Sequence, residues 1–319
     1  MIVDVHSRIW ESADQLGRIA EQLRRRRGEP WTRPAASPED HHQAMAPVEN
    51  AVILGFESRL LGASIGHEKV AEYVSRDRSK YLGFAGIDPG LDEPVKSLER
   101  ALDLGLAGVV VSPAAQGFHP ADTRAMELYE ACEARGVPVM IESGVMFARE
   151  GQAEFAQPYL LDEVARSFPG LKLILSSLGH PWIDQALALI AKHPTVYGDF
   201  SELIPRSWQL YNALLQAYQL GVMGQLVFGS NFPFYTPEKA IVTIYSVNTL
   251  VQGTHLPSVP REQLRAVVER DTLACLGLAT PDGPASPASS DTDDGQPAPD
   301  EVASDSDTAP AAASQESTS

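Results

Sequence analysis

The chain has 319 residues, 44% of them hydrophobic, and a formal net charge of −17 at pH 7. No uninterrupted apolar stretch reaches the ~18 residues of a membrane-spanning helix, and so acidic a chain repels phosphate backbones, which disfavours general nucleic-acid binding. The start lacks a signal-peptide pattern, and Cys132 and Cys275 are too few for a disulfide framework, so we expect a cytoplasmic protein.

The negative charge is concentrated at the C-terminal end. Residues 281–319 hold nine acidic residues and no Lys or Arg, which leaves −8 on the rest of the chain. Residues 280–319 are biased to Pro, Ala, Ser and Asp and lack aromatic residues, so they bury too little apolar surface to offset chain entropy. We expect this acidic tail to be disordered. The one basic run, Arg24 to Arg27, ends a predicted helix over 12–27 and is typical of a solvated helix end, although RNA or an acidic partner is an alternative.

Strand-like runs alternate with helical segments along residues 1–279. This alternation is the signature of parallel βαβ units, and no Gly-x-Gly-x-x-Gly turn follows the first run to support an open dinucleotide-binding sheet. The sequence therefore predicts one (β/α)₈ TIM barrel over 1–279. The eight runs are Ile2–His6, Ala51–Phe56, Leu82–Ile87, Gly108–Val111, Val137–Glu142, Leu171–Ser176, Val196–Asp199 and Leu226–Gly229.

Two segments depart from the simple alternation. Residues 11–50 contain four prolines, which break any long helix, and we interpret this insertion as a lid or an oligomerisation element. After the eighth run, Arg261–Leu276 has the pattern of an amphipathic helix, which we expect to pack on the outside of the barrel.

The polar residues at the strand ends are the candidate site, because chemistry in this fold gathers where the C-terminal ends of the strands converge. These positions are His6, Arg8, Asp88, Ser112, Glu142, Ser177, Asp199, Ser201 and Asn231. Five segments, most of them around these strand ends, resemble motifs of the amidohydrolase-related family of the amidohydrolase superfamily and occur in the same order along the chain. They are Asp4–Trp10, Gly83–Pro89, Gln116–Pro120, Leu178–Asp184 and Phe228–Phe234.

The resemblance implies a barrel of the metal-dependent hydrolase type, but with a degenerate metal site. Metal-dependent members carry His-x-His at the end of the first strand, a His after the fifth and the sixth, and an Asp after the eighth. Matched motif to motif, only the first His is kept, as His6. The other four positions hold Arg8, Glu142, Ser177 and Asn231, and Ser112 stands where the fourth-strand block of relatives often has His.

These replacements disfavour a catalytic divalent ion. Zinc needs about three N, S or O ligands from the protein, and His6 and Glu142 supply two. Arg8 repels a second cation a few ångströms away by several kcal/mol, and the Asn231 amide has no basicity to handle a proton from water. We therefore expect no metal cofactor, and hypothesise that Arg8 fills the place of the ion, paired with Glu142 and hydrogen-bonded by Asn231 or Ser177.

The remaining polar residues near the mouth have structural interpretations beside functional ones. His6 is as consistent with packing as with ligand binding, and we expect His119 and His180 to form structural hydrogen bonds and Asp88 to form a turn. Asp199 and Glu202 suit a cationic ligand, although Asp199 also suits a helix cap. The aromatic residues either line a pocket or pack, with packing the commoner role: Phe147, Trp182, Phe232, Phe234 and Tyr235.

Three functions stay open. The first is a non-catalytic barrel that binds a small molecule or a partner, either as a homo-oligomer or with an active paralogue, and its pocket residues are His6, Arg8, Ser112, Glu142, Ser177, His180, Trp182 and Asn231. The second is a metal-independent, lactonase-like hydrolase, in which Arg8 polarises a carbonyl and Asp199 or Glu142 acts as base. The third, a metal-dependent hydrolase or decarboxylase of small carboxylated or aromatic substrates, fits the residues least.

Overall fold

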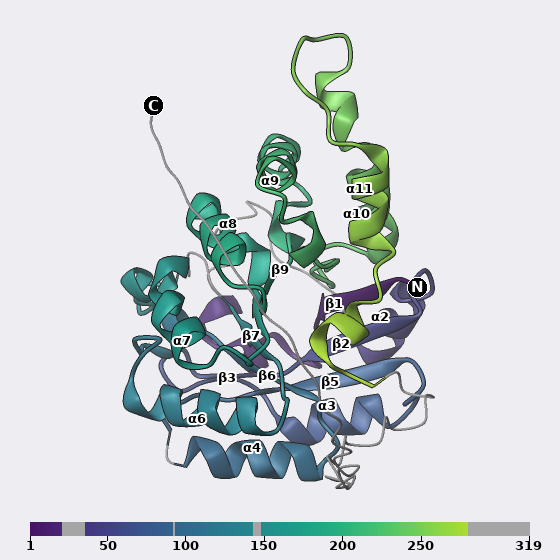
Figure 1. The fold of residues 1–319 in the computed structure, drawn as a ribbon. Coiled ribbons are helices and arrows are strands. Elements are labelled where there is room, and N and C mark those ends of the chain that lie inside the picture. The colour runs from purple at the N-terminus through teal and green to yellow at the C-terminus, as the bar shows by residue number, and fades with distance from the viewer. Residues whose placement is uncertain (21–35, 92, 143–147, 280–319) are drawn as a thin grey trace, which may run out of the picture. The chain divides into compact units, whose positions relative to one another are not determined.

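Seven parallel strands form the main sheet, and their order in the sheet follows their order in the chain (Figure 1). The computed structural model describes residues 1–20, 36–91, 93–142 and 148–279, so the predicted tail, the Arg24–Arg27 run and Phe147 lie outside the described residues. The strands are β1 (Val3–Ser7), β2 (Asn50–Leu54), β5 (Tyr81–Gly86), β6 (Gly108–Val111), β7 (Val139–Ile141), β8 (Leu173–Leu175) and β9 (Val196–Gly198). All residues of these strands are buried, as expected for a parallel sheet that is covered on both faces.

The eighth predicted run closes the sheet, although it is not a regular strand. The Val227 N–H donates to the carbonyl oxygen of Gly198 (3.0 Å), and the Val5 N–H donates to that of Phe228 (2.9 Å). Parallel bridges join Gly198 to Leu226 and Ser7 to Phe232. Residues 226–232 thus connect β9 to β1, and the predicted TIM barrel is confirmed.

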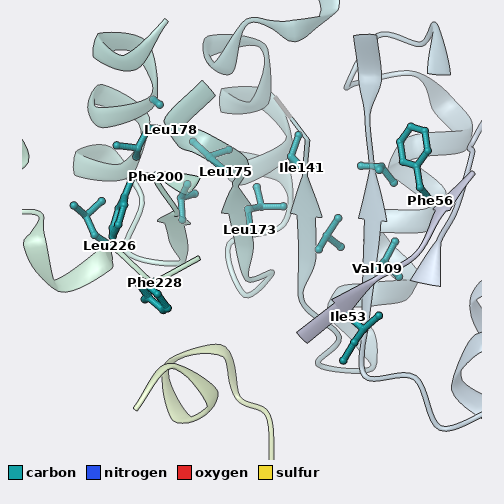
Figure 2. Close-up of a cluster of buried hydrophobic side chains, with 14 of the residues drawn as sticks. Ile53, Phe56, Val109, Ile141, Leu173, Leu175, Leu178, Phe200, Leu226 and Phe228 are labelled. Carbon is teal, nitrogen blue, oxygen red and sulfur yellow. The ribbon is translucent and has the colours of Figure 1, made fainter. Parts of the chain in front are cut away.

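Helices cover the outer face of the strands. Figure 2 shows side chains of this layer, among them Ile53, Val109, Ile141 and Leu173, which pack in the large core beneath the helices. The α-helices are α2 (Pro38–Ala44), α3 (His67–Val74), α4 (Pro94–Asp103), α5 (Pro113–Gln116), α6 (Thr123–Ala134), α7 (Asp162–Ser167), α8 (Ile183–Lys192), α9 (Ser207–Gln219), α10 (Pro237–Tyr245), α11 (Arg261–Val268) and α12 (Thr272–Leu276). Short 3₁₀ turns are η1 (Ala13–Leu16), η2 (Ala153–Ala156), η3 (Pro158–Leu161), η4 (Ser176–Gly179), η5 (Ser201–Leu203), η6 (Met223–Gln225) and η7 (Val247–Val251). Among the described residues, no helix is both long and apolar enough to cross a membrane.

The end of the barrel domain differs from the prediction. The expected helix over Arg261–Leu276 is two helices, and α12 begins where the Asp271 carboxylate accepts a hydrogen bond from the Ala274 N–H (3.0 Å). Leu273 and Leu276 of α12 do not lie on the barrel exterior. They pack in a second core, inside the barrel, with one or two side chains from each strand of the main sheet and one from the closing segment: Val3, Val5, Val52, Leu54, Leu82, Phe84, Val110, Met140, Ile174, Tyr197 and Val227. This helix therefore plugs the barrel interior with its fully buried Leu273 and Leu276 side chains.

A two-stranded antiparallel sheet follows β2. The second strand was predicted to run through Phe56, but β2 ends at Leu54, and Phe56 begins β3 (Phe56–Ser58), which pairs with β4 (Ala63–Ile65). A Cβ on Gly55 would lie 2.8 Å from the Gly86 amide nitrogen. The glycine thus lets this hairpin sit against the end of β5.

The described parts of the 11–50 insertion pack on the barrel. His41 of α2 is fully buried, with Nε2 2.9 Å from the Ser7 hydroxyl and Nδ1 2.7 Å from the Tyr73 hydroxyl. Its ring makes edge contacts with Tyr73, Tyr81 and Phe232, and burial lowers the pKa of His41 to about 3. A neutral imidazole thus anchors α2 to β1. The lid or oligomerisation role stays a prediction.

Candidate functional site

The predicted residues follow the C-terminal ends of the strands that carry them. His6 and Arg8 lie at the end of β1, Ser112 follows β6, and Glu142 follows β7. Ser177 belongs to η4 after β8, Asp199 follows β9, and Asn231 lies in the segment that closes the barrel. The register of β1 against β2 shifts between Asp4 and Ser7. Irregularities of this kind change the direction in which side chains point and are common next to active sites.

Asp199 is the centre of a buried hydrogen-bond network. One carboxylate oxygen lies 3.1 Å from His6 Nδ1, and the other accepts the Ser177 N–H (3.0 Å) and the Ser201 N–H (2.9 Å). Burial by itself raises the pKa of Asp199, but the His6 imidazole and the hydrogen bonds from His6 and Ser201 outweigh burial, so its pKa lies below the ordinary value. Asp199 is therefore an ionised carboxylate that orients the His6 ring.

Two serines extend this network without forming a catalytic triad. The Ser201 hydroxyl lies 3.1 Å from His6 Nδ1 and 3.0 Å from the Ser177 hydroxyl, which accepts the Glu202 N–H (3.2 Å). In a Ser-His-Asp triad the serine and the aspartate bond to different nitrogens of the imidazole. Here Ser201 and Asp199 share Nδ1. The arrangement therefore fixes the ring but gives Ser201 no base.

Arg8 and Glu142 form an ion pair across the mouth, as hypothesised. Each side chain is 14% exposed, and the Arg8 guanidinium carbon lies 5.9 Å from the centre of the Phe56 ring. Burial lowers the pKa of Arg8 to about 10, against the opposing charges of Asp199 and Glu202, which leaves the guanidinium charged near neutral pH. The mouth thus holds a permanent cation with its own counter-charge.

The second part of the hypothesis is wrong. Among the described residues, Arg8 makes no hydrogen bond to Ser177 or Asn231, and its Nε has no hydrogen-bond partner. Ser177 is engaged instead by Ser201 and the Glu202 N–H. Asn231 is held by its backbone, because its N–H donates to the His6 carbonyl oxygen (3.0 Å) and its φ is 63°. Its left-handed conformation is one that Asn tolerates better than most residues.

Two residues near the site were not predicted from the sequence. Asp4 is fully buried, and one of its oxygens accepts the His6 N–H (3.0 Å) and the Ser230 N–H (2.9 Å). Burial raises the pKa of Asp4 to about 6. Gln116 joins three backbone segments: its amide oxygen accepts the Ser112 N–H (2.7 Å), and its amide nitrogen donates to the carbonyls of Glu57 (2.6 Å) and Ile87 (2.8 Å).

A signal for both residues was present in the sequence. Asp4 stands two residues before His6, and Gln116 opens one of the five segments that carry the family resemblance. Ser112, predicted as a pocket residue, uses its hydroxyl to donate to the Glu142 carbonyl oxygen (3.2 Å). These three residues position the backbone of the mouth.

The other mouth candidates are mostly structural. The Asp88 carboxylate accepts the Gly90 N–H (2.9 Å) and the Arg59 N–H (3.0 Å), which confirms its turn role, and burial raises its pKa. His119 Nδ1 accepts the Ala121 N–H (3.1 Å), also a structural role.

Trp182 lines a hollow between α8 and α9, and His180, just after η4, is half-buried. Phe232 packs on His41, Phe234 packs on Trp10, and Tyr235 is half-buried against the large core.

The donor set does not fit a divalent cation. His6 Nδ1 is bonded to Asp199, which leaves only Nε2 of this ring as a donor, and the Glu142 carboxylate is paired with Arg8. Within the described ranges, no group of three or more His, Cys, Asp or Glu side chains is placed to hold a metal ion. The positively charged Arg8 adds repulsion to this shortage of ligands.

The family model for amidohydrolases matches residues 3–269. The chain belongs to this amidohydrolase family. No curated protein matches it. The membership agrees with the resemblance expected from the five sequence segments, and with the barrel described above.

Solved structures share this fold. An uncharacterised TIM-barrel protein from Bordetella bronchiseptica is 23% identical, with 86% of this chain and 99% of that chain covered and a TM-score of 0.68. The 5-carboxyvanillate decarboxylase of Sphingomonas paucimobilis is 12% identical, with coverages of 87% and 99% and a TM-score of 0.64. A dihydroxybenzoic acid decarboxylase from Polaromonas, solved with manganese and 2-nitroresorcinol, is 14% identical, with coverages of 86% and 96% and a TM-score of 0.58. At these identities the likeness shows the fold alone.

Proposed function

We propose that this amidohydrolase-family barrel binds a small molecule, without a divalent metal and without hydrolysing it, and acts as a ligand- or partner-binding protein. The observation that carries the proposal is the Arg8–Glu142 ion pair among the strand ends. By the family resemblance, Arg8 and Glu142 stand at two positions where metal-dependent relatives place histidines. The partner in this proposal is a second copy of the chain or an active paralogue.

The physical support is that the Arg8 and Glu142 charges neutralise each other inside the site. A buried charge without a counter-charge costs several kcal/mol, so one new cation and one new carboxylate stabilise each other only as a pair. A divalent ion entering here would meet a fixed positive charge and would have to break the pair to gain Glu142 as a ligand. Asn231 contributes an amide, which has no basicity to take a proton from water.

Metal content tests the proposal. We expect protein purified from medium with zinc and manganese, and dialysed without chelator, to hold far less than one ion per chain by elemental analysis. A variant with the family's ligands restored, Arg8→His, Glu142→His, Ser177→His and Asn231→Asp, is expected to bind about one zinc ion per chain. Arg8→Ala is the matched control, since it removes the repulsion without adding donors. One tightly held ion per wild-type chain contradicts the proposal.

A metal-independent hydrolase is the second candidate. It is favoured by the Asp199 carboxylate, ionised and bonded to His6, in the same mouth as the Arg8 cation. A panel of lactones and small amides, assayed with metal-free protein, separates the two functions. Turnover that is lost in both Arg8→Ala and Glu142→Ala, while folding is retained by circular dichroism, replaces the binding proposal with catalysis.

A further inference from the structure

A hollow lies between α8 and α9 on the outside of the barrel, and none of His6, Arg8, Glu142 and Asp199 lines it. It has a volume of about 470 Å³, which is within the range of small-molecule sites. Trp182 lines it from the start of α8 and Trp208 from the start of α9, and Figure 1 shows the two helices beside each other. Of its described lining residues, only Asp184 carries a charge.

Helical spacing brings an aromatic side chain and two carboxamides of α9 to the lining of the hollow. Trp208, Asn212 and Gln216 recur at every fourth residue of α9, so they lie along one face of the helix. Gln185 lies in the first turn of α8, and the small side chain of Ala213 lines the hollow between the helices. The hollow therefore combines two indole rings with a row of carboxamides.

Trp208 presents an aromatic ring to solvent. It is 57% exposed, although the nearby Tyr211 ring, 5.8 Å away between centres, packs against it. An exposed tryptophan held by a neighbouring ring offers a rigid apolar face at a small cost in side-chain entropy. The aliphatic C–H faces of a pyranose ring are suited to stack on such a face.

The carboxamides supply neutral hydrogen-bonding groups. The Asn212 amide nitrogen donates to the Trp208 carbonyl oxygen (2.7 Å), which leaves the amide oxygen as an acceptor. The amide oxygens of Gln185 and Gln209 are buried and have no hydrogen-bond partner among the described residues. A buried amide oxygen without a donor costs about 1–3 kcal/mol, so a ligand hydroxyl toward which these side chains turn would relieve that cost.

We propose that this hollow binds a neutral saccharide unit, stacked on Trp208 and hydrogen-bonded by the carboxamides. A phosphate or carboxylate ligand is disfavoured because Asp184 is the only charged group in the described lining. The proposal concerns the outside of the barrel, so it does not depend on the state of the mouth.

Saturation-transfer NMR and calorimetry with maltose, lactose and N,N′-diacetylchitobiose test this site on the full chain, with gluconate as the charged comparison. We expect one of the three disaccharides to bind with millimolar affinity and gluconate not to bind. Trp208→Ala is expected to weaken the binding by about tenfold, the loss of ~1.4 kcal/mol of stacking. Asn212→Leu is expected to weaken it by a smaller factor.

Tyr218→Ala is the matched control, because Tyr218 is 41% exposed on the same helix but does not line the hollow. Its affinity is expected to equal that of the wild type. Absence of binding by all three disaccharides overturns the proposal, as does an unchanged affinity in Trp208→Ala. Concentration-dependent self-association that Trp208→Ala abolishes, without sugar binding, also overturns it and assigns the surface to an interface between copies.

Discussion

The two ends of the barrel interior solve the problem of burial in different ways. At the α12 end, Val5, Leu273 and Leu276 are fully buried hydrocarbon and need nothing but neighbours of suitable volume. At the mouth, Asp199 is equally buried but is held by three specific hydrogen bonds, and Arg8 requires a counter-charge. The comparison teaches that the buried side chains of the plug are stabilised by apolar packing, whereas the buried side chains of the mouth depend on the identity of each partner.

Leu273→Ala breaks the comparison at the apolar end and is expected to have the largest effect. Removing a fully buried leucine from a closed interior leaves a cavity, so we expect the free energy of unfolding to fall by about 4 kcal/mol, measured by urea denaturation. Leu256→Ala, at a leucine that is 50% exposed, is the control and should change it by less than about 0.5 kcal/mol. A loss below ~1 kcal/mol in Leu273→Ala would mean that α12 does not plug the barrel.

Glu142→Gln tests the charged end. It leaves the Arg8 guanidinium without its nearest counter-charge, and we expect the free energy of unfolding to fall by about 3 kcal/mol. The double variant Arg8→Met, Glu142→Leu removes both charges and is expected to recover most of this loss, because neither desolvated group remains. If the two variants were equally unstable, the mouth would depend on packing like the plug, and the contrast between the two ends would disappear.

His41 sharpens the comparison with a third case, a buried polar group that is stable only when neutral. Its folded-state pKa of about 3 lies below the unfolded value of 6.5, so the unfolded chain binds the proton more tightly. Stability is therefore complete above pH 6.5 and falls as the pH drops toward 3, by about 2 kcal/mol between pH 7 and pH 5.

The measurement is urea denaturation across this pH range for the wild type and His41→Gln. Gln keeps polar groups beside Ser7 and Tyr73 but does not titrate. We expect the slope of unfolding free energy against pH between 5 and 6.5 to be smaller in the variant by about one proton. Equal slopes would show that His41 titrates alike in the folded and unfolded chain.

The sequence was sufficient for the architecture because the alternation of apolar runs and helices extends along the whole domain. It was not sufficient for α12, since helical periodicity shows that Leu273 and Leu276 lie on one apolar face but not which surface that face covers. The hairpin at Phe56 was missed because three-residue strands carry too short a pattern to separate from β2.

The site followed the same division. The rule that strand ends converge found His6, Arg8, Glu142 and Asp199, and opposite charges at converging strand ends predicted the ion pair. The hydrogen-bond partner of the Ser177 hydroxyl was not predictable. It bonds to Ser201 and not to Arg8 because of the local turn, in which the φ of Ser177 is 54°. Such a choice depends on ångström-scale placement that residue types do not encode.

Gln116 has a mechanical consequence for one side of the mouth. Its single carboxamide is bonded at once to the β3 hairpin, to the end of β5 and to the segment after β6. Outward movement of any one of these three segments would break a hydrogen bond to the same side chain, so we expect this part of the rim to resist opening. A molecule that enters the mouth would therefore find little room to displace the rim on the Gln116 side.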